Sequence, residues 1–424
     1  MITSHKKKVL TGESAVHVLF IHQNFPAQFG HIAAQLVKRD GWRATFVSQS
    51  APNLGQTQTA GIERVTYTIK GGATEANHYC SRTFENAIWH THGVYEALAA
   101  RPDIKPDLIV GHSGFGSTLF LRELYGDIPI INYFEYFYAP RNSDMDFRKD
   151  FPNVPLDSLR AKARNATLLL DLDNCTAGYS PTKWQRDRLP DRYHDKVDVI
   201  FDGVDTQIWK PMPDAPRILQ NRQIPTTTKI VSYATRGMES MRGFDIFMKA
   251  ANRVAKRRKD VLFVIAGQDR VCYGGDTRHT NGKTFKEWVL AQEEFDLNRF
   301  WFTGLLPPME LARLFTLTDV HVYLTVPFVL SWSLVNAMAC EATILASDTG
   351  PVREMITDGE TGLMCDFFDV DAMAAKIESV LEKPSDYSHL GPNAGRKVQE
   401  NFSLDVCLPK LRDYYAEVAS RASQ

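Results

Sequence analysis

Residues 319–363 read DVHVYLTVPFVLSWSLVNAMACEATILASDTGPVREMITDGETGL, and this stretch decides the fold. The apolar run 320–324 predicts a buried strand, and residues 343–346 predict a second one. Between them, a short loop with two serines leads into a helix that we expect Ser333 to open. The second strand ends in the turn SDTGP at 347–351. A loop that runs into a helix N-terminus in this setting predicts a site for a phosphate or diphosphate.

The same alternation of short apolar runs and amphipathic segments extends over the whole chain, and it is typical of parallel sheets flanked by helices. In the first half, the predicted strands are residues 16–22, 44–48, 107–111, 128–133, 171–180 and 197–201. The predicted helices there are residues 29–39, 85–100, 117–125 and 182–189. In the second half, the strands are residues 230–234, 261–266, 300–303, 320–324 and 343–346, with helices at 244–258 and 308–315.

A break in this pattern suggests two domains. Residues 202–211 read DGVDTQIWKP, a turn followed by a proline break, which is typical of a linker. The length of 424 residues also suits two cores rather than one. We therefore predict an N-terminal domain over 14–203, a C-terminal domain over 204–403 and a final helical stretch over 404–424. Ligands of doubly wound sheets bind beyond the carboxyl ends of the strands, so two such domains should face each other across a substrate cleft.

The composition excludes several classes of protein. The formal net charge of −1 leaves no basic footprint for nucleic acid. The six cysteines are dispersed without a C-x-x-C pair, which favours reduced thiols in a cytoplasmic protein over disulfides or a zinc site. His22 and His31 lack a third ligand at a fitting spacing, so no metal is predicted. The patch at residues 5–8 (HKKK) is interpreted as a solvated arm rather than a binding site.

We also expect no membrane span, because no uninterrupted apolar run reaches the roughly 18 residues that a bilayer needs. The basic tail leads into a strand rather than an apolar segment, which speaks against a signal peptide. The expected localisation is therefore cytoplasmic, with peripheral membrane contact left open.

Two arginines are the first candidates for chemistry. Arg236 and Arg242 follow a predicted strand and precede a helix, so both should lie at the carboxyl edge of the sheet. Two guanidinium groups there suit a diphosphate whose charge grows as a bond to it breaks. Surface arginines near a helix start are the alternative. Cations are unfavourable at that end of a helix dipole unless an anion compensates them, which favours the functional interpretation.

The loop Leu330-Ser331-Trp332-Ser333 is a second candidate, because the amides of Leu334 and Val335 would face an anion beyond the cap. A plain N-cap without a ligand is an equally simple interpretation. His112 in the stretch VGHSGFGS follows a buried strand and could bond a sugar hydroxyl or a phosphate oxygen. A structural histidine bonded to a nearby carbonyl is the alternative there.

Two further regions of the first half are candidates. Gly30 opens a helix after the first strand and would bring backbone close to a ligand. The aromatic and then polar stretch at 133–152 is long for a connection, and long ordered loops are often functional. Glu135, Arg141 and Asp144 in that stretch could bond hydroxyls, and Glu135 and Arg141 are the expected acceptor-binding residues. An aromatic cluster that only packs the interdomain side is the alternative.

From about Val16 to its end, the chain resembles the family 4 glycosyltransferases, which have the GT-B fold of two doubly wound Rossmann-like domains. The stretch FDGVDTQIWKP is similar to the family's interdomain signature, with Asp202 where asparagine is usual. Arg236 and Arg242 match the arginine and lysine that bind the donor diphosphate. By the same resemblance, other positions contact the donor or its nucleotide: Gly267 and Leu306 in the loops AGQD and FTGLLP, and His112. The resemblance also implies that the last helix crosses back onto the N-terminal domain.

The chain departs from the family at its best-known motif, two glutamates separated by seven residues. Phe328 and Asn336 stand at these positions. In the family, the first glutamate lies near the transferred sugar and the second accepts hydrogen bonds from the ribose diol. A carboxylate accepts both diol hydrogens, whereas an amide offers one carbonyl acceptor. Losing one charge-assisted bond costs about 1.5–3 kcal/mol and weakens binding about tenfold to a hundredfold.

The resemblance therefore implies a metal-independent, retaining glycosyltransferase. It would use a UDP- or GDP-sugar as co-substrate, without any other cofactor, and a small-molecule, glycan or glycolipid acceptor. The expected catalytic residues are His112, Arg236 and Arg242. The expected donor-binding residues are Gly30, Gly267, Leu306, Ser331, Ser333, Leu334, Val335 and Asn336. A degenerate protein that binds a sugar nucleotide without transfer, and a GT-B nucleotide-sugar epimerase, are the alternatives.

Overall fold

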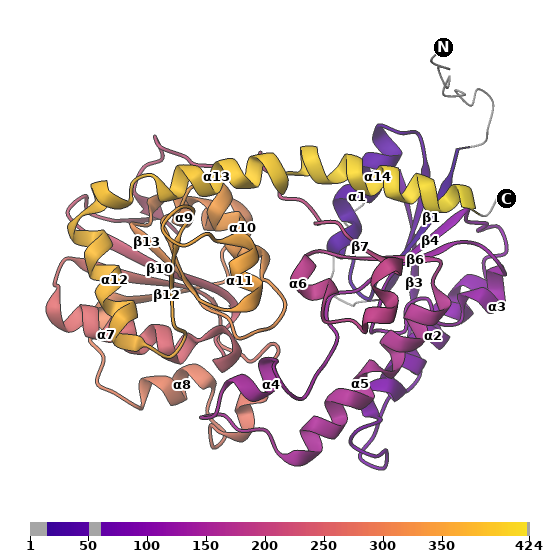
Figure 1. Cartoon of the computed structure of the whole chain (residues 1–424), viewed down its shortest axis with the longest axis horizontal. Helices are drawn as coiled ribbons and strands as arrows, with labels where there is room; N and C mark the ends of the chain where they lie inside the picture. Colours follow the sequence, from indigo (N-terminus) through magenta and orange to yellow (C-terminus); the bar gives the residue numbers. More distant parts are fainter. Residues whose placement is uncertain (1–14, 51–60, 422–424) are drawn as a thin grey trace. The chain divides into compact units, whose positions relative to one another are not determined.

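Parallel β-sheets organise both halves of the chain in the computed structural model, which describes residues 15–50 and 61–421 (Figure 1). The patch at residues 5–8 lies outside the described residues. One sheet has seven strands in the order β3-β2-β1-β4-β5-β6-β7, and the other has six in the order β12-β11-β10-β13-β14-β15. The order reverses beside the first strand of each sheet, β1 or β10, which is the doubly wound arrangement expected from the sequence.

The bounds of the elements agree with most of the predicted ranges. The strands of the first sheet are β1 (His17–Ile21), β2 (Arg43–Gln49), β3 (Ile62–Tyr67), β4 (Leu108–His112), β5 (Ile130–Tyr133), β6 (Ala177–Ser180) and β7 (Val197–Val199). Those of the second are β10 (Lys229–Gly237), β11 (Val261–Gln268), β12 (Phe300–Gly304), β13 (Val320–Tyr323), β14 (Ile344–Ser347) and β15 (Leu363–Cys365). A short antiparallel ribbon pairs β8 (Ile218–Leu219) with β9 (Arg222–Gln223).

Fourteen α-helices lie in the described residues. Those up to the predicted linker are α1 (Gly30–Lys38), α2 (Arg82–Ala99), α3 (Leu121–Tyr125), α4 (Asp144–Phe147), α5 (Pro155–Asn174) and α6 (Lys183–Arg186). Those beyond it are α7 (Phe244–Arg257), α8 (Phe285–Leu290), α9 (Pro308–Leu317), α10 (Trp332–Ala339), α11 (Gly350–Met355), α12 (Val370–Glu382), α13 (Leu390–Asn401) and α14 (Leu404–Ser420). None of them is both long and apolar enough to cross a membrane.

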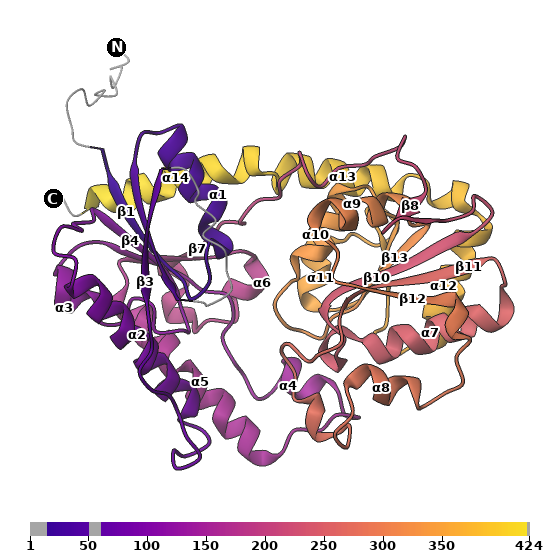
Figure 2. The same cartoon turned by 180° about the vertical axis from the view of Figure 1, so that it is seen from behind.

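The six-stranded sheet is buried on both faces, which explains why its strands are continuous apolar runs. Val231 and Phe263 point to one face, where they pack with α7, α8 and α12. Ile230 and Val264 point to the other face, where they pack with α9, α10, α11 and α13. Figures 1 and 2 show these two helical layers on either side of the strands. With side chains held from both faces, the carboxyl ends of these strands form a fixed edge.

The chain passes between two compact units several times. One unit contains the described residues of Met1–Tyr133, together with Ala166–Tyr179 and the described part of Leu411–Gln424. The other contains Phe134–Asn165 and Ser180–Lys410. Residues 134–165 and 180–203, which a single boundary at 203 assigns to the N-terminal domain, therefore pack with the second half of the chain.

The end of α14 packs with the first unit. The Tyr414 hydroxyl donates to the Gly178 carbonyl at 2.6 Å, and the hydroxyls of Tyr415 and Tyr179 lie 2.9 Å apart. The helix thus contributes its last turns to the unit formed mainly by residues 15–50 and 61–133.

Three expectations about local structure were wrong. The strand predicted over 171–180 is only β6, because residues 171–174 complete α5. The helix expected from residue 117 begins at Leu121, since Gly114 and Gly116 have φ of 94° and 72° and keep the preceding segment in a turn. Ser333 does not cap α10. The N-cap is Ser331, whose hydroxyl accepts the Ser333 amide at 3.3 Å.

Candidate functional site

The carboxyl edge of the six-stranded sheet holds the two predicted arginines. Arg236 lies near the end of β10 and is exposed. Arg242 ends the 3-10 helix Ser240–Arg242, and Gly243 follows it with φ of 62°, which turns the chain into α7. An added Cβ at Gly243 would lie 2.8 Å from Cβ of Leu324. Glycine therefore allows both the turn and the close packing that bring Arg242 to the end of β13.

Arg242 is held rigidly at this edge. Its side chain is buried, and Nη1 donates to Thr325 Oγ1 at 2.7 Å and to the Val329 carbonyl at 3.1 Å. Its guanidinium lies 5.2 Å from the ring centroid of Tyr273 and 5.9 Å from that of Phe328. These contacting groups are uncharged, while the charge of Arg242 also acts on the nearby Glu239 carboxylate. The remaining N–H groups of the guanidinium can still donate to an anion.

Tyr273 connects the two arginines. The Tyr273 side chain is 42% exposed, and its hydrogen bond with Arg236 is the largest cause that raises the pKa of this arginine. The Glu135 carboxylate raises it further through its charge. Tyr273 therefore interacts with both guanidinium groups, one exposed and one buried.

A buried carboxylate fixes the loop that carries Tyr273. Glu239 Oε2 accepts the successive amides of Cys272, Tyr273 and Gly274 at 3.0, 2.8 and 3.1 Å. Burial raises the pKa of Glu239, and these three hydrogen bonds oppose that shift. Three amide donors converging on one oxygen make a strong anchor. The sequence analysis missed Glu239 and Tyr273, because the 33 to 35 residues between the partners hide their contact.

A cavity of about 420 Å³ opens beside these groups, at the ends of β11 and β12. Gly267, Phe302 and Lys286 line it, and the Lys286 ammonium lies 4.3 Å from the Phe302 ring centroid. Gly267 has φ of 149°, and an added Cβ would lie 2.5 Å from the Thr235 carbonyl oxygen. An aromatic wall with polar rims suits a planar, partly polar ligand. Leu306, two residues beyond this edge, is partly buried and packs on the core below.

The serine loop before α10 is organised by its own hydrogen bonds. The hydroxyls of Ser331 and Ser333 lie 2.9 Å apart, and the Leu334 amide donates to the Ser331 carbonyl at 3.1 Å. Leu334 and Val335 point into the core with no exposed surface. The Trp332 indole donates to Asp202 Oδ2 at 3.3 Å, which ties the linker signature to this loop.

The two positions that depart from the family motif differ in their surroundings. Phe328 is buried to 8% exposure and lies among the rings of Tyr136, Tyr273 and the Arg242 guanidinium. Asn336 is half-buried on α10. The acidic residue nearest to Asn336 along the following sequence is Glu341. It lies beyond the C-terminus of α10 with φ of 57° and is exposed.

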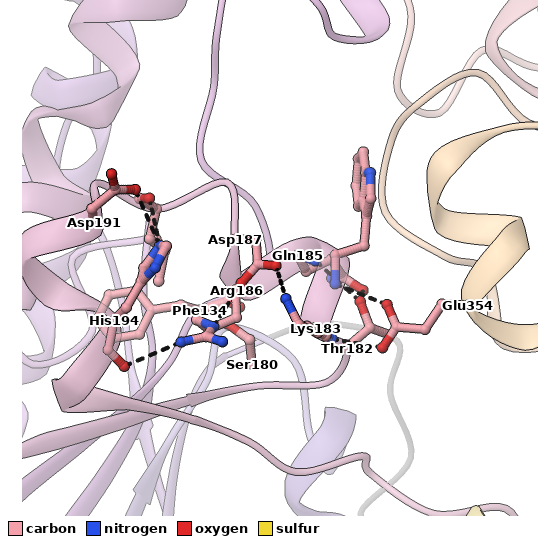
Figure 3. A network of polar contacts seen from close by, with 12 residues as sticks. Phe134, Ser180, Thr182, Lys183, Gln185, Arg186, Asp187, Asp191, His194 and Glu354 are labelled. Atoms are coloured by element: carbon pink, nitrogen blue, oxygen red, sulfur yellow. Dashed lines mark hydrogen bonds and ion pairs between the residues drawn. The ribbon is translucent and has the colours of Figure 1, made fainter.

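The candidate acceptor residues belong to the same unit as the arginines. Gln185 Nε2 donates to the Glu135 carbonyl at 2.6 Å, and the Thr182 hydroxyl caps α6 by accepting the Gln185 amide. Glu354 of α11 accepts the amides of Lys183 and Trp184 at 2.7 and 2.8 Å, as Figure 3 shows. This network fixes the backbone at Glu135. Arg141 is exposed in the loop before α4.

His112 and Gly30 lie in the other unit. His112 ends β4, is buried, and its Nδ1 lies 2.8 Å from the Ser113 carbonyl oxygen. Its ring lies 5.1 Å from that of His22, and burial together with the nearby His112 lowers the pKa of His22 to about 3. Gly30 opens α1, where an added Cβ would lie 2.9 Å from the Pro26 ring.

A further buried group, which the sequence analysis missed, supports the loop after His112. Asp171 Oδ2 accepts the Ser113 hydroxyl at 2.8 Å, and burial raises the pKa of Asp171 to about 6.

Comparisons with protein families match most of the chain. Residues 40–209 match a model described as "Glycosyl transferase family 4 group", and residues 214–397 match one described as "Glycosyl transferases group 1". The D-inositol 3-phosphate glycosyltransferase of Corynebacterium glutamicum is 25% identical over 75% of this chain and 74% of its own length. The alpha-maltose-1-phosphate synthase of Mycolicibacterium smegmatis is 25% identical over 53% of this chain and 58% of its own length.

Solved structures show the same fold at lower identity. Sucrose-phosphate synthase from Thermosynechococcus elongatus superposes with a TM-score of 0.73 at 17% identity, covering 96% of this chain and all of that one. Anabaena HepE, solved in complex with UDP and glucose, superposes with a TM-score of 0.67 at 15% identity, covering 95% and 100% of the two chains. The two parallel-sheet units match those of GT-B proteins.

Proposed function

The chain belongs to the family 4 group of GT-B glycosyltransferases, and from that premise we propose that it transfers a sugar from a UDP- or GDP-sugar to an acceptor with retention of anomeric configuration. The observation that carries the proposal is the pair of arginines around Tyr273, with an aromatic-walled cavity next to them. The nucleoside occupies that cavity, and the diphosphate lies between Arg236 and Arg242.

The two guanidinium groups stabilise the leaving diphosphate. Negative charge builds up on it as the glycosidic bond breaks, and fixed cations stabilise that charge without reorganisation. Arg242 is already fixed by Thr325 and the Val329 carbonyl, so little entropy is lost when the anion binds. The departing phosphate oxygen takes the proton of the attacking acceptor hydroxyl on the same face of the sugar, and His112 orients the sugar.

The second candidate function is binding of a sugar nucleotide without transfer of the sugar, because Phe328 and Asn336 replace both glutamates of the family motif. Calorimetry with UDP, GDP, UDP-glucose, UDP-N-acetylglucosamine and GDP-mannose, run beside assays of donor hydrolysis, distinguishes the two. Hydrolysis or transfer with a retained anomeric configuration, read by NMR, supports the transferase. Binding without turnover in any acceptor mixture favours the binder. No binding contradicts both.

The arginines provide a direct test of the binding mode. Arg236→Ala should weaken UDP or GDP binding at least about tenfold, the usual loss for one charge-assisted bond, with the thermal midpoint unchanged because the side chain is exposed. Arg396→Ala, an exposed arginine on α13, is the matched control. Equal affinities of the two variants would contradict the assignment.

A further inference from the structure

A carboxylate from a distant part of the sequence reaches Phe328. Tyr136 is buried to 5% exposure, and its ring lies 4.7 Å from the Phe328 ring in an edge-to-face arrangement. The Tyr136 hydroxyl lies 2.7 Å from Asp144 Oδ1 and 3.2 Å from the Pro327 carbonyl oxygen. A hydroxyl has one proton, and the shorter contact to a carboxylate is the stronger one. Asp144 is therefore separated by one hydroxyl group from the backbone just before Phe328.

Asp144 is held in place but keeps capacity to bind. It opens α4, where the Ser143 hydroxyl accepts the Met145 amide at 3.1 Å and Asp146 accepts the Ser143 amide at 2.9 Å, so the short helix is capped from both sides. The Asp144 carboxylate accepts the Tyr136 hydroxyl through Oδ1, and its own backbone amide and the charges of Arg164 and Arg188 also stabilise its charged form. A carboxylate has about four acceptor positions, so these contacts leave capacity for a further hydrogen-bond donor. Burial raises the pKa of Asp144, which indicates a partly desolvated site where a hydrogen bond is strong.

The order of groups along the sheet edge indicates which part of a bound nucleotide sugar would donate a hydrogen bond to Asp144. The cavity lies at the ends of β11 and β12, the arginines follow β10, and Phe328 follows β13, which neighbours β10 on the side away from β11. A diphosphate has two substituents, a nucleoside and a sugar. If the cavity takes the nucleoside, as in the proposed function, the sugar is directed toward Phe328.

Sugar chemistry fits these groups. Phe328 and Tyr136 are almost fully buried, so their rings shape this side of the site rather than stack on a sugar. A carboxylate is the strongest side-chain acceptor for hydroxyl protons, and Asp144 supplies one here. We propose that Asp144, positioned by Tyr136, accepts a hydroxyl of the donor sugar and so supplies a carboxylate where residue 328 has none. The inference rests on the proposed function, and it names the residue that recognises the sugar rather than the nucleotide.

The test compares a nucleotide sugar with its nucleotide. The probes are UDP-glucose with UDP, or GDP-mannose with GDP, whichever pair the unmodified protein binds. Asp144→Asn should weaken binding of the nucleotide sugar about tenfold and leave binding of the nucleoside diphosphate unchanged. Tyr136→Phe, which keeps the ring on Phe328 and removes the hydroxyl, should show a smaller loss of the same kind. Asp371→Asn, a largely exposed aspartate on α12, is the matched control.

Deoxy sugars locate the contact. Among deoxy analogues of the donor, the one that lacks the bonded hydroxyl should bind the unmodified protein and Asp144→Asn equally well, while the others keep the tenfold difference. Unchanged affinity of Asp144→Asn for both probes would overturn the inference and leave the proposed function standing. An equal loss for both probes would also overturn it, because Asp144 would then shape the diphosphate site. If the unmodified protein binds no nucleotide, the proposed function fails first.

Discussion

Asn336 is the residue whose replacement says most about donor binding. It is half-buried on α10, five residues after the capping Ser331. We predict that Asn336→Glu tightens binding of the nucleotide sugar about tenfold to a hundredfold, because a carboxylate accepts both hydrogens of a ribose diol. Calorimetry measures the gain, and Asn336→Gln, which lengthens the side chain without adding charge, should show none. An unchanged or weaker affinity for Asn336→Glu would mean that the ribose is held by other groups.

The sequence predicted single residues well where a strand end alone determines their position. Arg236 and Arg242 lie at the carboxyl edge because the strand before them is long, apolar and easily recognised. The cap of α10 was misplaced by two residues, since either serine can accept an amide and the choice depends on the Tyr323 hydroxyl, 3.0 Å from the Ser331 amide. Contacts such as that of Tyr136 with Pro327, 191 residues apart, leave no local signal.

The turn between α10 and β14 contains a strained residue. Glu341 has φ of 57°, a conformation that costs a residue with a Cβ about 1 kcal/mol relative to glycine. We predict that Glu341→Gly raises the free energy of unfolding by about 1 kcal/mol, measured by chemical denaturation. Glu341→Ala also removes the side chain that lies near Gly395 but keeps the strain, so it should give no gain. A similar gain for both variants would rule out backbone strain as the cause.

The segment around α4 is attached to α7 by a buried ion pair. Arg148 donates from Nη1 and Nη2 to the Asp245 carboxylate at 2.8 and 2.7 Å, and Nη1 also bonds the Ser240 carbonyl at 3.0 Å. Removing one partner leaves an uncompensated charge, so Arg148→Met should cost about 3–5 kcal/mol of unfolding free energy. Adding Asp245→Leu removes that charge and should restore part of the loss, as measured by urea denaturation. A double variant as unstable as Arg148→Met would show that packing, not charge, dominates.

Elements were predictable where their periodicity is strong. All strands of the six-stranded sheet except β15 were predicted, because burial on both faces requires continuous apolar runs. β3, with only Val65 and Tyr67 buried among its six residues, was missed, as was α5. The sequence of α5 is rich in charged and polar residues along its length, so its apolar stripe is weak.

At the scale of the whole molecule, the boundary in the sequence and the boundary in space differ. The two family models meet between residues 209 and 214, where the linker signature suggests a division. In space, residues 134–165 and 180–203 pack with the second unit, and the end of α14 packs with the first. The reason is the set of long-range polar contacts made by Arg148 and Glu354, which composition and spacing do not reveal. Glu135, Arg141 and Asp144 therefore share a unit with Arg236 and Arg242.

The buried histidines make the stability of the molecule depend on pH, and those of the two units can be examined separately. His321 in the second unit has no exposed surface, bonds the Ser232 hydroxyl at 2.9 Å, and burial lowers its pKa to about 3. Below pH 6.5 this histidine is protonated in the unfolded chain, whereas in the folded protein it stays neutral until about pH 3. Stability present above pH 6.5 is therefore lost as the pH falls, by about 2 kcal/mol at pH 5 from this group. In the first unit, His22 acts in the same direction as His321 because burial lowers its pKa to about 3. The raised pKa of Asp171 opposes this, since it adds stability as the pH falls from about 6 toward 3.8. We predict that His321→Gln flattens the pH dependence of hydrogen-exchange protection in β10 and β13 between pH 7.5 and 5, without changing that of β1 and β4. Parallel pH profiles for the variant and the unmodified protein in β10 and β13 would contradict the prediction, whatever the absolute stability of the variant.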